Sequence, residues 1–383
     1  MNGKKLTTWK DKILFTPGPL TTSRTVKQAM LKDLGSRDYE FIEIVKNIRT
    51  HLLNIAGVKK NEYEAIIMQG SGTFGLESVV GSTIPPDGKF LVIINGAYGR
   101  RIAQMARILK IETKVLEYPE NALPDLEEIE KTVKEDEGIT NVCVVHCETT
   151  TGIINPIKEI GEITSRYGRK FFVDAMTTFG AVPIDFNACH IDYLVTSANK
   201  CLEGVPGCSL IIAKSSSLAA TEGYARSLSM DILAQLKGLE KDGQFRFTPP
   251  IQVLMALGQA LDELEEEGGI AGRAVRYKTN YETLLAGMRE MGFIEYLFPN
   301  IRGYIITSFL NPVHPNYSFD EFYRKLNEKD QVIYPGKLST WDGFRIGTIG
   351  RITATDVKVL LNSIRETLDE MHVQLKPVVV KER

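Results

Sequence analysis

The chain has 383 residues, of which 43% are hydrophobic and 25% are charged, and its formal net charge is -2. This length and composition are ordinary for a globular protein and allow two domains. The near-neutral charge excludes the basic surface of a nucleic-acid-binding protein, and no apolar run is long enough to span a membrane.

In the first two thirds of the chain, short apolar runs alternate with amphipathic stretches such as 99–110 and 156–168. The runs predicted as strands are residues 64–68, 89–95, 113–118, 140–147, 170–175, 192–198 and 209–214. They are apolar nearly throughout rather than alternating, which is typical of strands covered by helices on both faces. The alternation predicts an α/β fold with a mostly parallel sheet.

The pattern changes near residue 265. Residues 261–292 read as long, charged, surface-type helices, and two apolar strand-like runs follow at 303–310 and 343–350. A last amphipathic helix is predicted at 354–371. This part of the chain therefore predicts a second, smaller domain.

A glycine-rich turn, GSGTFG at 70–75, lies between a predicted strand and a predicted helix. Its spacing matches a dinucleotide fingerprint, but the acidic residue expected at the next strand end is absent, and Asn95 stands there. This disfavours a nicotinamide cofactor. Free backbone N–H groups and the hydroxyls of Ser71 and Thr73 instead predict a phosphate site. A turn without a ligand is the alternative.

Two opposite charges also stand at strand ends. Asp174 closes the run 170–175, and Lys200 follows the run 192–198. A carboxylate at such a place is costly unless it is paired, so a simple salt bridge is one explanation. Together with a phosphate turn, however, the two residues match pyridoxal 5′-phosphate, whose aldehyde reacts with lysine and whose ring nitrogen needs a carboxylate.

Several runs resemble the class V aminotransferases of fold type I. The matching runs are QGSGTFGLES, NGAYGRR, HCETTTGIINP, VDAMTTFGAVPID, SANKCLEGVPG and RFTPP. The resemblance implies a pyridoxal-phosphate transferase with a mostly parallel seven-stranded sheet and a smaller α/β C-terminal domain. It divides the chain into an N-terminal arm over the active site (1–25), a large cofactor-binding domain (26–265) and a small domain (266–383).

The resemblance also implies the residues of the site. Lys200 matches the lysine that forms the Schiff base, and Asp174 matches the partner of the ring nitrogen. The cofactor-binding residues that it implies are Ser71, Gly72, Thr73, Tyr98, Thr149, Asp174, Asn199, Lys200 and Thr248. Tyr98 is expected to stack on the ring, Thr149 to touch the ring 3-oxygen, and Asn199 to lie close to the phosphate.

Thr248 matches a threonine that reaches the cofactor phosphate of a neighbouring subunit, which implies a homodimer with shared active sites. Nearby, Phe245 departs from the family, because some members carry a tyrosine there that donates to the phosphate. Arg246 is the residue that stands next to it and can replace that donor.

The substrate must carry an anion at its far end. Arg345 is the candidate for binding it, because a guanidinium offers a planar fork for carboxylate or phosphonate and is costly to leave unpaired in an apolar strand. Arg351 is the second candidate. Gly18, in the N-terminal TPGPL run, is expected to expose backbone N–H groups near the substrate.

Within the class, the runs are most similar to members that move the amino group of 2-aminoethylphosphonate to pyruvate, by ping-pong exchange, giving phosphonoacetaldehyde and L-alanine. An alanine– or serine–glyoxylate (or pyruvate) transaminase is the alternative. A cysteine desulfurase is disfavoured because all five cysteines lie before residue 209. A cofactor-free binding protein is disfavoured by the intact Lys200 and Asp174.

The cysteines and the N-terminus bear on location. The five cysteines include no CxxC pair, and the N-terminal residues lack the apolar stretch of a signal peptide. We therefore expect a cytoplasmic protein with reduced thiols, no metal site, and no membrane or nucleic-acid partner.

Overall fold

The computed structural model describes residues 11–336 and 342–377. The first ten residues of the predicted arm, and residues 337–341 and 378–383 of the predicted small domain, lie outside the described residues. The helices described are α1 (Arg24–Gln28), η1 (Ala29–Leu31, 3₁₀), α2 (Tyr39–Ala56), α3 (Gly72–Thr83), α4 (Ala97–Ile108), α5 (Leu126–Glu135), α6 (Ile157–Arg166), α7 (Ser215–Ala219), α8 (Ile232–Asp242), α9 (Ile251–Glu266), α10 (Gly269–Glu290), α11 (Phe319–Glu328) and α12 (Ala354–Glu370).

The strands fall into one large sheet and three small ones. The strands described are β1 (Ile13–Leu14), β2 (Tyr63–Gln69), β3 (Lys89–Ile94), β4 (Glu112–Glu117), β5 (Ile139–Val145), β6 (Cys147–Glu148), β7 (Ile153–Ile154), β8 (Lys170–Asp174), β9 (Tyr193–Ser197), β10 (Cys208–Lys214), β11 (Ile306–Leu310), β12 (Gln331–Val332), β13 (Tyr334–Pro335) and β14 (Gly343–Gly347).

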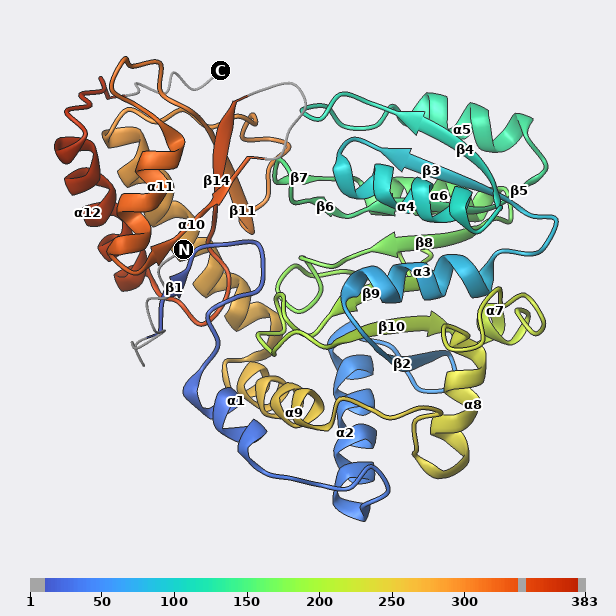
Figure 1. Cartoon of the computed structure of the whole chain (residues 1–383). Helices are drawn as coiled ribbons and strands as arrows, with labels where there is room; N and C mark the ends of the chain where they lie inside the picture. The colour runs from blue at the N-terminus through green and yellow to red at the C-terminus, as the bar shows by residue number, and fades with distance from the viewer. Residues whose placement is uncertain (1–10, 337–341, 378–383) are drawn as a thin grey trace.

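The large sheet has seven strands in the order β2-β10-β9-β8-β5-β3-β4. It is parallel except for β10, which runs antiparallel to both of its neighbours. All seven strands predicted from apolar runs are present, and the predicted mostly parallel α/β sheet is confirmed. Figure 1 shows this sheet in the right-hand part of the molecule, with β4 and β2 at its two edges.

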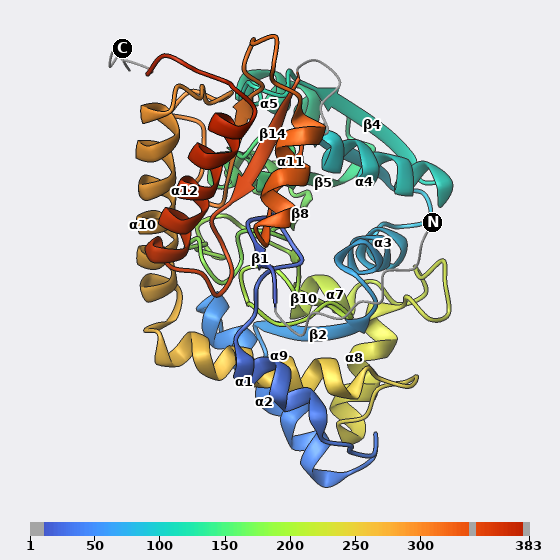
Figure 2. The same cartoon turned by 60° about the vertical axis from the view of Figure 1, so that its left-hand side comes forward.

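Helices cover both faces of the large sheet, which explains why its strands are apolar throughout. From β3 the chain moves outward through α4 to β4, and it returns through α5 to β5 on the other side of β3. Since such crossovers are right-handed, α3 and α4 lie on one face and α5 and α6 on the other. Figure 2 shows α3 and α4 at the right of the molecule, and the two helices contact each other. Because these strands are parallel, their carboxyl ends lie at the same edge of the sheet.

The C-terminal part forms a smaller unit, at the left of Figure 1. Its antiparallel sheet has the order β11-β14-β13, and α10, α11 and α12 pack beside it. Aromatic side chains fill its core: the ring of Phe344 lies 5.6 Å from that of Phe293 and 5.7 Å from that of Phe309. These contacts fix β14, which carries Arg345, and the expected second sheet is confirmed.

The described part of the arm belongs to this smaller unit at its start. β1 pairs in parallel with β12, and Phe15 is fully buried in the aromatic core. The chain then crosses to α1, which packs on α9. Residues 16–23 therefore bridge the two parts of the molecule.

The helices expected at 261–292 are present, as the end of α9 and as α10, and α10 has an exposed face. Its buried face is unusual because it carries polar side chains: Arg273, Tyr277 and Asn280 are all at 0% exposure. These side chains recur three or four positions apart, so they share a helix face. The charge of the segment obscured this polar buried face. Across the described residues, no helix is both long and apolar enough to cross a membrane.

Candidate active site

Lys200 and Asp174 meet at the carboxyl edge of the large sheet. Asp174 ends β8, where it is in register with Val195 of β9, and Lys200 lies in the turn that follows β9. Neighbouring parallel strands thus bring the two side chains within electrostatic reach of each other. This is the edge where ligands bind in open α/β sheets.

Burial shifts both groups toward their neutral forms. Burial lowers the pKa of Lys200 to about 8, and the charge of Arg345 acts in the same direction. Burial raises the pKa of Asp174 to about 6, against a hydrogen bond from the Met176 N–H and the charges of Lys200 and Arg101. A lysine that loses its proton near neutral pH suits nucleophilic and general-base chemistry.

The glycine turn lies at the start of α3, and Ser71 is the N-cap residue of that helix. Its hydroxyl makes no capping hydrogen bond, so it is free to bind a ligand. The turn also packs against the segment after Asp174, because a Cβ at Gly72 would lie 2.3 Å from Met176 Sδ. Ser71, Gly72 and Thr73 thus offer hydroxyls and first-turn N–H groups beside Asp174, as an anion site requires.

Tyr98 lies in the first turn of α4, and a buried carboxylate that the sequence patterns did not indicate holds it there. Glu148 accepts hydrogen bonds from the N–H groups of Tyr98 at 2.8 Å and Gly99 at 2.9 Å, and from the Thr150 hydroxyl at 3.0 Å. Burial raises the pKa of Glu148 to about 7. Because Thr149 follows Glu148 directly, Tyr98 and the Thr149 turn are both held by Glu148.

Arg345 comes to the same place from the smaller unit. Side chains alternate along β14, so Phe344 enters the aromatic core while Arg345 points to the other face of the sheet. Arg345 Nη1 donates to the Thr149 carbonyl at 2.7 Å, and its Nε donates to the Pro335 carbonyl at 3.2 Å. It is 3% exposed, and burial lowers its pKa although the nearby Glu148 carboxylate acts to raise it. No ion pair joins Arg345 to a carboxylate among the described residues. Its charge is therefore available for an anionic ligand.

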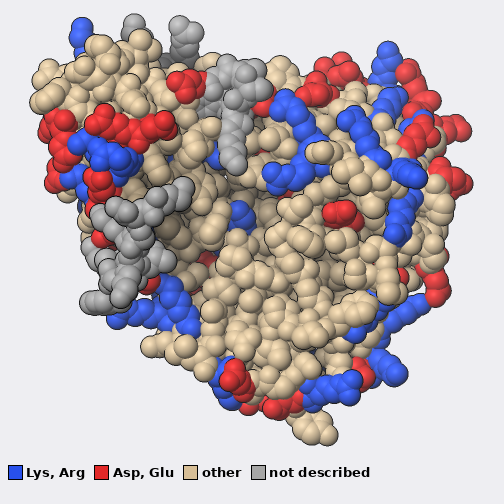
Figure 3. All heavy atoms as spheres, in the orientation of Figure 1, with Lys and Arg blue, Asp and Glu red and all other residues tan. Residues whose placement is uncertain are grey.

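The arm passes directly over the lysine. Lys200 Nζ donates to the carbonyl of Pro17 at 2.8 Å. Gly18 has φ +125°, and a Cβ there would lie 2.5 Å from Lys200 Nζ, so only glycine fits. Figure 3 shows a hollow between the two parts of the molecule, with basic atoms visible inside it.

The remaining predicted residues are less closely gathered. Asn199 precedes Lys200 in the turn. Thr248 is exposed, and its carbonyl accepts from Gln69 Nε2 at 3.3 Å, beside the glycine turn. Arg246 donates to the Leu228 carbonyl at 3.0 Å, and Phe245 packs against the large core. The second candidate for the substrate anion, Arg351, is exposed, and its backbone N–H donates to the arm.

These groups fit pyridoxal 5′-phosphate. The Ser71 hydroxyl and the α3 N-terminus suit its phosphate, the buried Asp174 suits a protonated ring nitrogen, and Lys200 suits its aldehyde. The two opposite charges, Asp174 and Lys200, lie close to each other, and the glycine turn packs beside Asp174; their roles remain predictions. Glu148 and the Pro17 carbonyl are additions that only the folded chain reveals.

Sequence comparisons agree with this chemistry. The model of the aminotransferase class-V family matches residues 23–334. Curated relatives named 2-aminoethylphosphonate–pyruvate transaminase, from Salmonella heidelberg and Salmonella typhimurium, are 46% identical over 363 residues, which cover 94% of this chain and 99% of each relative.

Solved structures of aminotransferases have the same fold. Pyridoxamine–pyruvate aminotransferase from Mesorhizobium loti is 23% identical with a TM-score of 0.86, covering 96% of this chain and 94% of its own. Alanine–glyoxylate aminotransferase from Nostoc sp. is 23% identical with a TM-score of 0.87, covering 95% and 97% of the two chains.

Proposed function

This chain belongs to the class V aminotransferase family, and we propose that it transfers the amino group of 2-aminoethylphosphonate to pyruvate. The products are phosphonoacetaldehyde and L-alanine. The cofactor is pyridoxal 5′-phosphate, and the protein is a transferase of fold type I.

The observation that carries the substrate assignment is the 46% identity to 2-aminoethylphosphonate–pyruvate transaminases over nearly the whole of both chains. The buried Arg345, without a carboxylate partner among the described residues, supplies the charge that a phosphonate needs. A glyoxylate transaminase is the weaker candidate, because the 23% identity to the Nostoc enzyme reflects the fold alone.

The cofactor, when bound, offers an aldehyde to amines and a ring that withdraws electrons from the carbon next to the amine. Asp174 then accepts a hydrogen bond from the ring N–H and keeps that nitrogen protonated. Lys200 Nζ, whose pKa burial lowers to about 8, would take the proton from the amine-bearing carbon of the donor and deliver it to the carbon of the former aldehyde. In the second half-reaction it would move a proton in the opposite direction. Ser71 and Thr73 hold the phosphate, and Tyr98 covers the ring.

Substrate binding uses the smaller unit. The guanidinium of Arg345 donates hydrogen bonds to the phosphonate of the donor in one half-reaction and to the pyruvate carboxylate in the other. Gly18 lets the arm close over Lys200, which excludes water from the reacting carbon. Because donor and acceptor use one site in turn, we expect ping-pong kinetics.

We also propose a homodimer in which Thr248 reaches the cofactor phosphate of the partner subunit. Its support is an apolar surface beside the glycine turn, where Phe74, Phe247 and Leu228 are 50%, 43% and 76% exposed. Single exposed apolar residues are common, but a group of them beside a site favours an interface. The five free, buried cysteines support a cytoplasmic location.

A titration of the purified enzyme with 2-aminoethylphosphonate alone tests the function. The visible absorption of the bound cofactor should be lost, and pyruvate should restore it with one alanine formed per site. If 2-aminoethylphosphonate leaves the absorption unchanged while alanine or serine removes it, the glyoxylate transaminase is correct instead.

A further inference from the structure

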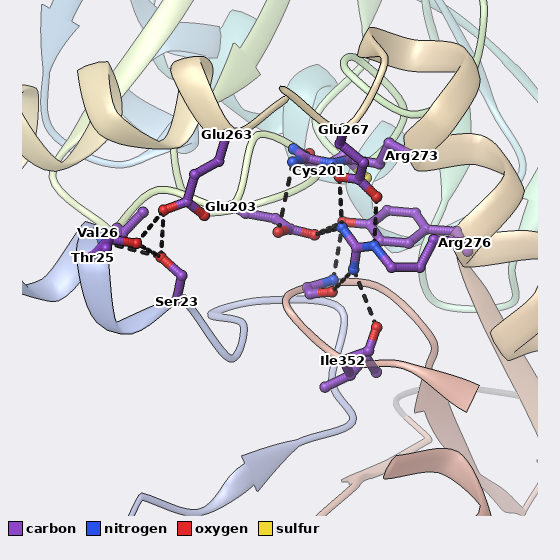
Figure 4. A network of polar contacts seen from close by, with 12 residues as sticks. Ser23, Thr25, Val26, Cys201, Glu203, Glu263, Glu267, Arg273, Arg276 and Ile352 are labelled. Atoms are coloured by element: carbon purple, nitrogen blue, oxygen red, sulfur yellow. Dashed lines mark hydrogen bonds and ion pairs between the residues drawn. The ribbon is translucent and has the colours of Figure 1, made fainter. Parts of the chain in front are cut away.

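A second group of buried charges lies next to the lysine turn, outside the reacting site (Figure 4). Arg273 and Arg276 of α10 both pair with Glu267, at 2.9 and 2.5 Å. Glu203 accepts hydrogen bonds from Arg276 Nη2 at 2.8 Å and from the Tyr277 hydroxyl at 2.5 Å. We call these five residues the Glu203 cluster.

The cluster holds the turn that carries Lys200. The Glu203 N–H donates to the Lys200 carbonyl at 2.8 Å, and Arg273 Nη1 donates to the Cys201 carbonyl at 2.8 Å. Glu203 itself has φ +60°, a left-handed conformation that is unfavourable for a glutamate. Its side-chain contacts to Arg276 and Tyr277 offset that cost. The turn is therefore fixed on the side away from the reacting atoms.

The same side chains also hold the segment that follows Arg345. The Gly350 N–H donates to the Tyr277 hydroxyl at 3.0 Å, and Arg276 Nη1 donates to the carbonyls of Gly350 at 2.5 Å and Ile352 at 3.1 Å. Residues 343–350 form a continuous buried segment. The position of Gly350 therefore constrains that of Arg345.

We propose that Glu203 is a positioning residue that sets the separation between Lys200 and Arg345, and with it the length of substrate that the site accepts. Glu203 is bound to the Lys200 turn through the backbone and to Gly350 through Tyr277. A substrate spans the two ends, with its amine at Lys200 and its anion at Arg345. This inference rests on the proposed function, which supplies the substrate with an amine and a distal anion.

A purely stabilising cluster would be expected to pair its charges fully. Instead, Arg273 Nη2 and Glu203 Oε2 form only a long ion pair at 3.7 Å, and neither of these buried atoms has a hydrogen-bond partner. The carboxylate is thus drawn toward Arg276 and Tyr277, which lead to Gly350, rather than centred between the two arginines. This placement favours a link between the lysine turn and the smaller unit.

Three variants test the proposal in the loaded enzyme. Glu203→Gln removes the charge and keeps the shape, and Tyr277→Phe removes only the hydroxyl that joins Glu203 to Gly350. Glu263→Gln is the matched control, because Glu263 is also buried but accepts from Ser23 and Thr25, which lie away from the lysine turn (Figure 4).

The first measurement compares kcat/KM for 2-aminoethylphosphonate with that for 3-aminopropylphosphonate, which is one methylene longer. The ratio should fall about tenfold in Glu203→Gln and severalfold in Tyr277→Phe, because small misplacements of reacting groups cost large factors in rate. Glu263→Gln should leave the ratio unchanged. The second measurement is the Kd of ethylphosphonate, which has the anion but no amine. Its Kd should agree within about twofold among the wild type and the three variants, because Arg345 is intact in all of them.

An unchanged ratio in both Glu203→Gln and Tyr277→Phe would overturn the proposal, as would a parallel loss of ethylphosphonate binding and of activity on both amines. Thermal unfolding shows whether Glu203→Gln is folded. If it is not, the ratio measured for Tyr277→Phe alone decides whether the proposal holds. If the wild-type enzyme does not turn over 2-aminoethylphosphonate at all, the proposed function has failed instead, and the two outcomes are distinct.

Discussion

The reacting site and the Glu203 cluster both bury acidic and basic side chains, yet their pKa values move in opposite directions. At the site, burial lowers the pKa of Lys200 to about 8 and raises that of Asp174 to about 6. In the cluster, burial is outweighed: pairing with Glu267 raises the pKa of Arg276, and pairing with Arg276 and Arg273 lowers that of Glu267.

The difference follows from what each charge is paired with. In the cluster, carboxylates and guanidinium groups form hydrogen-bonded pairs that favour the charged forms. At the site, Lys200 donates to a neutral carbonyl and Asp174 accepts from a backbone N–H, so desolvation dominates. Charges left without a partner of opposite sign are those that a ligand can pair with, which is why perturbed pKa values gather at functional sites.

Removal of Lys200 should give the largest effect and should separate activity from stability. Lys200→Ala is expected to lower turnover by at least about 10⁴-fold, because it removes both the amine that meets the aldehyde and the general base. Stability should not fall, since a buried lysine with a lowered pKa does not favour folding. Alanine formation and thermal unfolding measure the two effects. Turnover near the wild-type level would refute the role of Lys200.

Unlike removal of Lys200, removal of one member of the Glu203 cluster should lower the free energy of unfolding. Arg273→Met leaves Glu203 and Glu267 with an unbalanced buried charge, and we expect a loss of about 4 kcal/mol in the free energy of unfolding. Lys27→Met, which breaks the exposed pair with Asp11, serves as control and should cost less than about 1 kcal/mol. Urea unfolding measures the free energy of unfolding of both variants. Equal losses would mean that the buried cluster contributes no more to stability than an exposed ion pair does.

The sequence predicted the site better than the cluster, for a physical reason. Continuous apolar runs identify buried parallel strands, and a charge at the end of such a run stands out, as Lys200 and Asp174 do. The glycine turn itself indicated Ser71, and motif similarity then added Tyr98. No such contrast marks Arg273, because charged residues lie on both the buried and the exposed faces of its helix, and the sequence pattern does not separate them.

Pairing across the chain is a second property that local patterns do not carry. Glu203 and Gly350 are far apart in sequence, and only the folded chain shows that Tyr277 joins them. Glu148 also lay within a recognised run, but its role depends on the N–H groups of another helix. The fold was therefore predictable from apolar patterns, whereas the groups that hold Tyr98 and the Lys200 turn in place were not.

Removal of Arg345 should separate substrates rather than abolish chemistry. Arg345→Ala is expected to lower kcat/KM for 2-aminoethylphosphonate about a hundredfold, or ~3 kcal/mol, because the phosphonate loses its buried cationic partner. With ethylamine, which has no distal anion, the loss should be a few-fold. By contrast, Asp174→Ala should lower the rate with both amines. Equal losses with both amines in Arg345→Ala would contradict its role as the anion site.

The pH dependence of stability gives the smallest and most direct test of desolvation at the site. The pKa of Asp174 is raised by folding, from 3.8 to about 6, so the folded protein binds the proton more tightly than the unfolded chain. Its contribution to stability is therefore present below pH 3.8 and is lost as the pH rises through 6.

Asp174→Asn removes this titration and keeps the shape of the side chain. In the cofactor-free protein, the stability of the variant relative to the wild type should increase by about 2 kcal/mol between pH 4 and pH 8. Urea unfolding at several pH values measures the difference. A constant difference would mean that favourable contacts offset the desolvation of Asp174, and a relative loss of stability at pH 8 would mean that pairing dominates at the site as it does for Glu267 in the cluster.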